Sequence, residues 1–563
     1  MAATTAAAGT VESYVSQIEH CIASKDLKLG RILHSCLLKT AFTLNTLLSN
    51  RLIDLYGKCG SPSCSRAAFD DLPSKNHQSW NTLLAAHLRY PALLSSARHL
   101  FEEMPERNLV SYNTMISKLC QHGFYQEALK TFSEMQREQL GMDKFTVVGV
   151  APACAGLGYL RSLRQLHCAI ISNGMQLNSI MSNVLIDGYG KCGDATSSQH
   201  VFDQMEVTDI VSWTSLLVAY TNTNRLDDAY QIFIKTPSRN AVSWTALISG
   251  FEQNGQEDAA VGLFEQMVAE GIVPTPLTFA STLSACAALG LVDRGKQVHC
   301  YVLRTCSGGA DGFNIFIQNA LMDMYAKCGD MDSASAMFNK MLERDVVSWN
   351  TMVTGFALNG LAKQSLDMLA SMLQGGVTPT HVTFLGVLSA CGHAGFIAEA
   401  RQLLRLMERE FGARPRPEHY AAIIDGLGRK NRLVEAMKVI ESLISNGGSS
   451  GVGLWGALLG ACQVHGNVEI GKRAAESLFL LEPENGARYV TLSNIYAAAG
   501  KWDEARRLRL VMKGKRLKKD VGCSWIEVKG VKQVFMAEDK SNSRTKEIYE
   551  MLDVLVEEIK KEM

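Results

Sequence analysis

The sequence has no surplus of charge of either sign and no long apolar run. Its 563 residues hold 56 Lys and Arg against 56 Asp and Glu, a balance that points to no particular partner. It argues mildly against a nucleic-acid binder, because phosphate contacts usually leave a basic excess. No run of 18 apolar residues indicates a membrane span. The content of 47% hydrophobic and 20% charged residues is typical of a soluble folded chain.

Motifs for catalysis are missing as well. A zinc deaminase needs a His-x-Glu and a CxxC, but none of the thirteen histidines has Glu two residues later and no two of the fifteen cysteines are three apart. Neither a P-loop nor a GxSxG stands out. We therefore expect no catalytic residue, no metal site and no cofactor, and predict that the protein is not an enzyme.

What the sequence does contain is a repeated pair of short amphipathic helices. Residues 315–380 show the pattern twice: an apolar run follows a small polar residue, breaks at a glycine, and resumes with apolar residues three and four apart. In the second helix an aromatic precedes Met by three residues at Phe101, Phe132, Phe202, Phe264 and Phe338. One such hairpin cannot bury its apolar face, so the copies must stack into a solenoid.

Two repeat lengths, 31 and 35 residues, are interleaved along the chain. Units are predicted to begin at residues 11, 46, 77, 109, 144, 179, 210, 241, 276, 315, 346, 381 and 417. The expected organisation is a short extension at 1–10, an array of about 13 repeats at 11–451, two further hairpins at 452–520, and a tail at 521–563 with a small β-hairpin and a helix. The extension is rich in Ala and Thr and lacks acidic residues, as a remnant of an organellar targeting signal would be.

Cysteine and histidine recur in register with the repeat. Cys21, Cys154, Cys286, Cys391 and Cys462 are eleventh in their units, and Cys59, Cys192 and Cys328 are fourteenth. A residue that recurs once per unit is most simply a small buried filler, so we predict thiols in a reducing compartment rather than metal ligands or disulfides. His34, His167 and His299 recur in the longer units and are likewise predicted to be packing residues.

A polar side chain recurs at the fifth residue of the short and 35-residue units. In five of these units it comes two residues after a serine, such as Ser348, that we expect to cap the helix. These fifth residues are Asn50, Asn81, Asn113, Asn183, Thr214, Thr245, Asn319 and Asn350. The last residue, which stacking would bring beside the fifth, is biased too: Asn76, Asn108, Asp143, Asp209, Asn240 and Asp345. Such groups can bind the edge of an unstacked base. The alternative is that they serve only turns and caps.

The second residue of a unit is apolar and can sandwich a base between neighbouring units. The candidates are Val110, Ile180, Val211, Val242, Phe316 and Val347. The longer units carry Val15, Val148, Ala280 and Leu385 at the fifth position, where no bidentate contact is possible, and are predicted to be spacers.

The alternating unit lengths resemble the plant PLS branch of the pentatricopeptide repeat family. The resemblance covers nearly the whole chain, and its motifs are VVSWNTM at 346, MYAKCG at 324, SACAALG at 284, GKQVH at 295, LSACGHAGF at 388 and GLGRKNRLVEA at 426. Residues 452–520 resemble the E1 and E2 motifs of editing factors. Residues 521–563 resemble an E+ segment that stops before a DYW cytidine deaminase domain begins.

This resemblance implies an all-α, right-handed superhelical solenoid that binds single-stranded RNA. By its rules Asn with Asp favours uracil, Asn with Asn a pyrimidine, and Thr with Asn adenine. From residue 46 the implied target reads, 5′ to 3′, pyrimidine, pyrimidine, uracil, unread, uracil, adenine, purine, unread, uracil and pyrimidine. The purine comes from Thr245 with Thr275, and the last pyrimidine from Asn350, whose unit ends at Thr380.

The resemblance also implies a role and partners. The protein would be the site-recognition factor for C-to-U editing of an organellar transcript, in the mitochondrion or alternatively the chloroplast. A DYW-type deaminase would be supplied in trans, with multiple organellar RNA editing factor proteins as further partners and no membrane. The alternatives are RNA stabilisation, splicing or translation without editing, and a TPR-like scaffold that binds peptide.

A basic patch lies in the last predicted hairpin. Residues 486–520 contain ten Lys or Arg against three Asp or Glu. This excess is consistent with a binding patch and equally with a solvated helix face.

Overall fold

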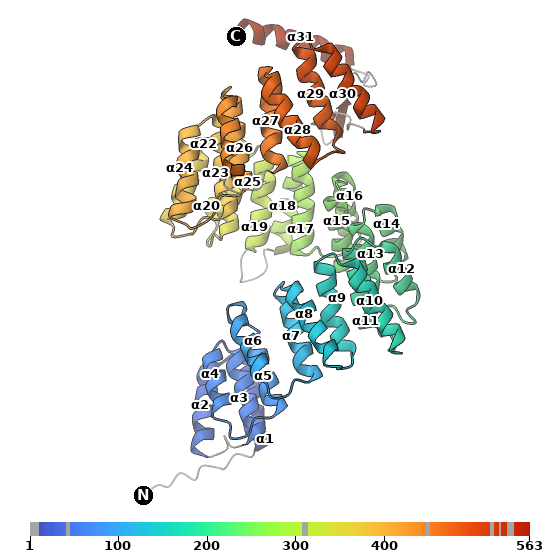
Figure 1. The fold of residues 1–563 in the computed structure, drawn as a ribbon, viewed down its shortest axis with the longest axis vertical. Coiled ribbons are helices and arrows are strands. Elements are labelled where there is room, and N and C mark those ends of the chain that lie inside the picture. The colour runs from blue at the N-terminus through green and yellow to red at the C-terminus, as the bar shows by residue number, and fades with distance from the viewer. Residues whose placement is uncertain are drawn as a thin grey trace. The chain divides into compact units, whose positions relative to one another are not determined.

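The computed structural model describes residues 11–40, 45–306, 314–445, 451–517, 523–528, 531–536 and 545–562. The helices, labelled in Figure 1, belong to two compact units, Met1–Asn254 and Gly255–Met563. The extension expected at 1–10 lies outside the described residues. No helix in the described part of the chain is both long and apolar enough to cross a membrane.

The first unit consists of helical hairpins. Its elements are α1 (Val11–Ser24), α2 (Leu27–Lys39), α3 (Thr46–Lys58), α4 (Pro62–Asp70), α5 (His77–His87), the 3-10 helix η2 (Pro91–Leu93), α6 (Leu94–Glu103), α7 (Leu109–Gln121), α8 (Tyr125–Arg137), α9 (Lys144–Gly156), α10 (Leu160–Ser172), α11 (Ser179–Lys191), α12 (Ala195–Asp203), α13 (Ile210–Asn222), α14 (Leu226–Lys235) and α15 (Ala241–Gln253).

The second unit continues the pattern and ends in the mixed tail. Its elements are α16 (Glu257–Ala269), α17 (Pro276–Leu289), α18 (Val292–Cys306), α19 (Ile315–Lys327), α20 (Met331–Lys340), α21 (Val346–Leu358), α22 (Ala362–Gln374), α23 (His381–Ala394), α24 (Ile397–Arg409), α25 (Pro417–Arg429), α26 (Leu433–Ser445), α27 (Val452–His465), α28 (Val468–Leu481), α29 (Gly486–Ala498), α30 (Trp502–Gly514), β1 (Cys523–Val528), β2 (Val531–Met536) and α31 (Thr545–Glu562).

The first helix of each hairpin begins at the residue where the repeat pattern placed the start of a unit. Within each compact unit these first helices contact one another in a row: α1, α3, α5 and so on to α15, and α17, α19, α21 and so on to α29. The second helices pack against the row. The predicted all-α solenoid is therefore confirmed. The turn glycines Gly193 and Gly329 have φ of 80° and 85°, a backbone conformation that side chains with a Cβ rarely adopt.

Edge-to-face aromatic contacts join one hairpin to the next. The repeated Phe of the second helix packs against an aromatic at the fourth residue of the following unit, with ring centroids 4.6–5.0 Å apart. The pairs are Phe69–Trp80, Phe101–Tyr112, Phe202–Trp213, Phe233–Trp244 and Phe338–Trp349. Such pairs are preferred over face-to-face stacks and add to the stabilisation from burial.

In eight hairpins the fourteenth residue links the first helix to the first helix of the preceding hairpin. Asn254 and Asn359 donate to the backbone oxygens of Thr221 and Ala326 at 2.9 and 2.8 Å. The Cys192 thiol lies 3.9 Å from the Cys154 backbone oxygen in the same arrangement. The same contact recurs at Cys59, Tyr90, His122, Cys328 and His465. The fourteenth-position cysteines are thus weak hydrogen-bond donors as well as fillers.

The eleventh-position cysteines are buried, as predicted, with exposed fractions of 0 or 1%. Burial raises the pKa of Cys154, Cys391 and Cys462 to about 11. The predicted packing histidines turn out to be hydrogen-bonded as well: His34, His167 and His299 place Nδ1 2.9–3.0 Å from a tyrosine hydroxyl of the next first helix.

The tail contains the predicted β-hairpin and helix. Strands β1 and β2 pair antiparallel, with Val528 opposite Val531. Helix α31 follows, and its Met551, Leu552, Leu555 and Val556 are exposed.

Candidate nucleic-acid interface

The fifth residue of a unit lies within the first helix and beside the last residue of the same unit. In five units the fifth residue is an asparagine whose Nδ2 donates a hydrogen bond to the side chain of the last residue. The pairs are Asn81–Asn108 at 3.5 Å, Asn113–Asp143 at 2.9 Å, Asn183–Asp209 at 3.3 Å, Asn319–Asp345 at 3.2 Å and Asn350–Thr380 at 3.3 Å. The fold therefore brings together the two positions that the sequence singled out.

The last residue of the unit, and not the serine, is the cap of the next first helix. Asp345 Oδ1 accepts from the backbone N–H of Ser348 at 2.8 Å, and the Ser348 hydroxyl donates to the same oxygen. Our assignment of Ser348 as the N-cap is wrong, because helix α21 begins three residues earlier than that assignment requires. The alternative interpretation is correct in part, since these Asn and Asp residues are caps.

The fifth residues themselves serve no cap and sit four residues inside their helices. Four of their side-chain oxygens are buried and have no hydrogen-bond partner among the described residues: Asn50 Oδ1, Asn81 Oδ1, Asn183 Oδ1 and Asn319 Oδ1. Leaving a buried acceptor unpaired costs about 1–3 kcal/mol. A buried unpaired acceptor that recurs at one position of the repeat needs an explanation, and a bound ligand or an ordered water is one.

The threonines at the fifth position behave differently. Thr214 donates its hydroxyl to the Ile210 backbone oxygen at 2.7 Å, and Thr245 donates to that of Ala241 at 2.6 Å. With its single proton used inside the helix, the Thr214 hydroxyl offers only lone pairs to a ligand. Asn240, its expected partner, caps α15 and no hydrogen bond joins the two in the described structure.

The predicted sandwich residues are all exposed although they are apolar. Phe316 is 47% exposed and Ile180 is 63% exposed, and Val110, Val211, Val242 and Val347 lie between these values. The sequence analysis missed four residues at the same second position, Leu47, Phe145, Leu277 and Val382, which are 46–61% exposed. Their place as the second residue of a unit would have been enough to predict them. The exposed apolar row therefore includes three of the four units that were predicted to be spacers, those that begin at residues 144, 276 and 381.

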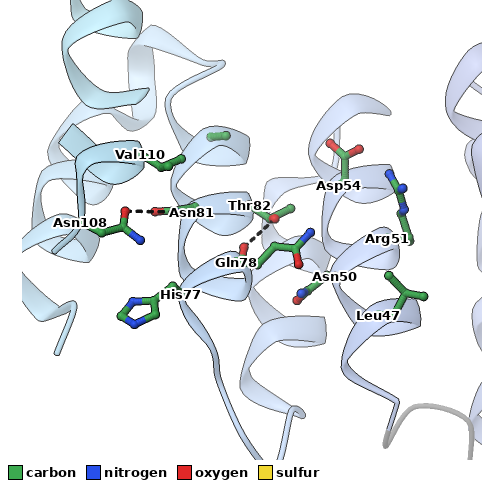
Figure 2. A pocket seen from close by; sticks show the side chains of 11 residues that line it. Leu47, Asn50, Arg51, Asp54, His77, Gln78, Asn81, Thr82, Asn108 and Val110 are labelled. Atoms are coloured by element: carbon green, nitrogen blue, oxygen red, sulfur yellow. Dashed lines mark hydrogen bonds between the residues drawn. The ribbon is translucent and has the colours of Figure 1, made fainter. Parts of the chain in front are cut away.

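One stretch of this surface is a groove of about 530 Å³. Figure 2 shows its lining, to which α3 contributes Asn50, α5 contributes Gln78 and Asn81, and α7 contributes Val110. Asn81 Nδ2 points to Asn108 Oδ1 across the step from one hairpin to the next. Two fifth residues, a cap residue and an exposed valine thus face one open cavity.

Two cap carboxylates are charged at neutral pH. The pKa of Asp209 is lowered, chiefly by the backbone N–H of Ser212. Burial acts to raise the pKa of Asp345, but the hydrogen bonds from Ser348 and Asn319 outweigh it and the pKa is lowered. Each carboxylate therefore only accepts hydrogen bonds, which fixes Nδ2 of the neighbouring asparagine as the donor.

The spacer positions and the basic patch are distinct from these pairs. Val15, Val148, Ala280 and Leu385 are half-buried and carry no polar group. In the patch, Arg509 donates to the Ser493 hydroxyl and Lys515 to the Tyr489 hydroxyl, whereas Arg506 and Arg507 are exposed. Lys518 and Lys519 lie outside the described residues. Among the described side chains, no group of three or more His, Cys, Asp or Glu is placed to hold a metal ion.

Comparison with known protein families matches most of the chain. Residues 107–155 and 239–288 match the PPR repeat family, residues 180–209, 211–240, 319–346, 382–410 and 418–448 the PPR repeat, and residues 337–394 the pentatricopeptide repeat domain. Residues 465–527 match the E motif.

Individual relatives cover nearly the whole chain. Pentatricopeptide repeat-containing protein At2g13600 of Arabidopsis thaliana is 37% identical over 98% of this chain and 74% of its own length. Protein At2g22070 of the same plant is 38% identical over 96% of this chain and 68% of its own length. Among solved structures, the pentatricopeptide repeat protein PPR10 from maize aligns with a TM-score of 0.45 and 17% identity, over 90% of this chain and 84% of that chain.

Proposed function

The chain belongs to the pentatricopeptide repeat family, and we propose that it binds one single-stranded RNA along its first helices and reads that RNA's sequence. One observation carries the proposal: a mid-helix amide, hydrogen-bonded to the next helix cap, recurs beside an exposed apolar side chain from unit to unit. Asparagine is a mediocre helix former, and its unpaired oxygens cost stability. The fold alone gives no reason to repeat it.

The chemistry of the two positions suits an unstacked base. The fifth residue can exchange hydrogen bonds with the base edge, while the second residues of neighbouring units contact the base faces. Contacts summed over many units supply affinity, so a chain with balanced charge can bind RNA without a large basic surface.

The proposed target follows from the pairs in order. From the unit at 46 to the unit at 346 it reads, 5′ to 3′, pyrimidine, pyrimidine, uracil, any base, uracil, adenine, purine, any base, uracil and pyrimidine. The adenine is supported by Thr214, whose hydroxyl is left as an acceptor for the adenine amino group.

More specifically, we propose that the protein selects a site for C-to-U editing in an organellar transcript, with the mitochondrion as the first compartment to test and the chloroplast as the second. The match of residues 465–527 to the E motif supports this role. A cytidine would lie a short way 3′ of the bound tract. Residues 452–563 would recruit a DYW-type deaminase, together with multiple organellar RNA editing factor proteins, since no His-x-Glu or CxxC occurs in these 563 residues.

Binding is tested with the purified chain and two RNAs of equal composition. The proposed target and a scrambled version are compared in a gel shift at one fixed salt concentration, because RNA affinity depends strongly on salt. We expect at least tenfold tighter binding to the target. Equal binding, or none, would contradict sequence-specific recognition and favour the peptide-binding scaffold.

Editing is tested separately in a null mutant by sequencing organellar transcripts. The proposal predicts that particular C-to-U events disappear while transcript size and abundance stay unchanged. Shortened, unspliced or untranslated transcripts with intact editing would instead support a role in stabilisation, splicing or translation. The prediction that the protein is not an enzyme is tested by incubating the purified chain alone with the target RNA. Conversion of cytidine by the chain alone would overturn it.

A further inference from the structure

Two of the asparagines differ from the rest in the state of their side-chain oxygen. The Thr146 hydroxyl lies 2.8 Å from Asn113 Oδ1 and 2.9 Å from Asp143 Oδ1, so the two oxygens share its proton. Asn350 Oδ1 accepts a hydrogen bond from the Thr383 hydroxyl at 2.5 Å. At the four junctions named above the corresponding oxygen is buried without a partner. The difference follows the third residue of the next unit, which is Thr at 146 and 383 and Ser at 79, 111, 212 and 348.

Close approach of the two helices lets the threonine hydroxyl reach the amide. The sixth residue of these units is glycine, at Gly149 in α9 and Gly386 in α23. A Cβ added to Gly386 would lie 3.0 Å from Val353 Cγ1 and 3.3 Å from Thr354 Cγ2, and one added to Gly149 would lie 3.2 Å from Ile116 Cγ2. At the four other junctions the sixth residue is Thr or Ser, which carries that Cβ.

At Asn350 the hydrogen bonds close into a ring. Asn350 Nδ2 donates to Thr380 Oγ1 at 3.3 Å, the Thr380 and Thr383 hydroxyls lie 3.2 Å apart, and Thr383 donates back to Asn350 Oδ1. Each hydroxyl in such a ring accepts once and donates once, so the bonds reinforce one another. The ring holds the amide with its oxygen committed and one N–H left over, and it does so without a carboxylate.

We propose that Thr146 and Thr383 are specificity-determining residues, which hold the amides of Asn113 and Asn350 with the oxygen turned to the threonine and an N–H group presented to the base, and so make them select uracil over cytosine. This rests on the proposed function. Uracil carries the acceptor O4 where cytosine carries the donor N4 amino group. An amide that can turn over presents either its oxygen or its N–H group to a base, whereas an amide whose oxygen is bonded to the threonine presents only its N–H group. The base opposite Asn350, which the pair Asn350 and Thr380 leaves as any pyrimidine, is then uracil.

The test measures the ratio of dissociation constants for cytosine and uracil at one RNA position. Fluorescence anisotropy with the full chain compares target RNAs that differ only at the base opposite Asn350. We expect Thr383→Val, which keeps the side-chain shape, to lower the preference for uracil about fivefold, because one selecting hydrogen bond is lost. Thr146→Val should do the same at the base opposite Asn113.

A second variant keeps Thr383 and changes only the distance between its hydroxyl and Asn350 Oδ1. Gly386→Ala places a methyl group against Val353 and should weaken the preference in the same direction, by about twofold, as the Thr383–Asn350 contact lengthens. Ser212→Ala is the matched control, since Ser212 completes a capping box as Thr383 does but makes no hydrogen bond to Asn183 Oδ1 in the described structure. It should leave the preference at the base opposite Asn183 unchanged.

The outcomes separate this inference from the function on which it rests. If Thr383→Val leaves the uracil preference unchanged, or if Ser212→Ala lowers it equally at its own base, the proposed role of the threonines is wrong while sequence-specific binding stands. If the wild-type chain binds target and scrambled RNA equally, the proposed function fails and the inference falls with it.

Discussion

Two kinds of first helix alternate in this solenoid. Helices such as α19 and α21 carry an amide at the fifth residue, whereas α9 and α23 carry Val148 and Leu385 there. Yet the second residue is exposed in both kinds, with Phe145 of α9 61% exposed and Phe316 of α19 47% exposed. The comparison teaches that exposed apolar side chains occur in helices of both kinds, while hydrogen-bonding groups at the fifth residue occur only in some. Under the inference proposed above, a spacer helix also acts on its neighbour's base, through its threonine.

The largest effect should come from a buried side chain of a spacer helix. Phe384 in α23 is 0% exposed, so Phe384→Ala should lower the free energy of unfolding by about 3–5 kcal/mol. Urea unfolding followed by circular dichroism checks it. Phe145→Ala, on an exposed position of the other spacer helix, should leave the unfolding midpoint unchanged, and a large loss there would break the comparison.

The next effect concerns the hydrogen-bonded pair of Asn319 and Asp345, whose asparagine is the fifth residue of helix α19. Replacing Asn319 and Asp345 together by Thr and Asn should move the preference at one RNA base from uracil toward adenine. We expect a change of about 2 kcal/mol in relative binding, because the wrong base leaves buried groups unpaired. Competition binding with four RNAs that differ at this base measures it. Leu385→Thr in a spacer helix should create no comparable preference.

A smaller effect is expected from the exposed apolar row alone. Phe145→Ala should weaken RNA binding by about 1–2 kcal/mol, which is within the range for one base–aromatic contact. All four bases at the facing position should lose affinity equally, since stacking is tolerant of base identity. A loss confined to one base would show that this spacer helix reads sequence after all.

The smallest effect is expected where a spacer unit contacts the next unit, and it concerns the pH dependence of stability. Burial lowers the pKa of His167, whose Nδ1 lies 3.0 Å from the Tyr189 hydroxyl. The unfolded chain then binds more protons than the folded one below about pH 6.5, so stability rises with pH there and is lost on acidification. His167→Gln should make the fall in unfolding free energy between pH 7 and 5 shallower. An unchanged slope would remove His167 as a contributor.

Much of the fold could be predicted because the sequence pattern of one helical hairpin is repeated many times. The spacing of Phe and of the fifth-position Asn fixed where each first helix begins, and the fold pairs Asn319 with Asp345 as stacking implied. The role of Ser348 could not be assigned correctly, since a serine at the third helical position and a serine at the cap look alike in sequence. Only the chain geometry shows that Asp345 is the cap.

The state of the amide oxygens was beyond sequence reasoning. Asn183 and Asn350 are the same residue at the same position, but one oxygen is unpaired and the other is bonded to Thr383. The next unit carries Thr383 and Gly386 beside Asn350, where it carries Ser212 and Ser215 beside Asn183. Repeat patterns report which residues share a position, and they do not report how closely two helices approach.

The link at the fourteenth residue has a consequence for how such a chain changes over generations. A thiol, an imidazole, an amide and a phenol all make the same contact with the preceding helix. Because the partner is always a backbone oxygen, the joint does not depend on the side chains of the preceding hairpin. A hairpin with such a donor can therefore follow any preceding hairpin, and under the proposed function duplication or deletion of hairpins would change the number of nucleotides covered.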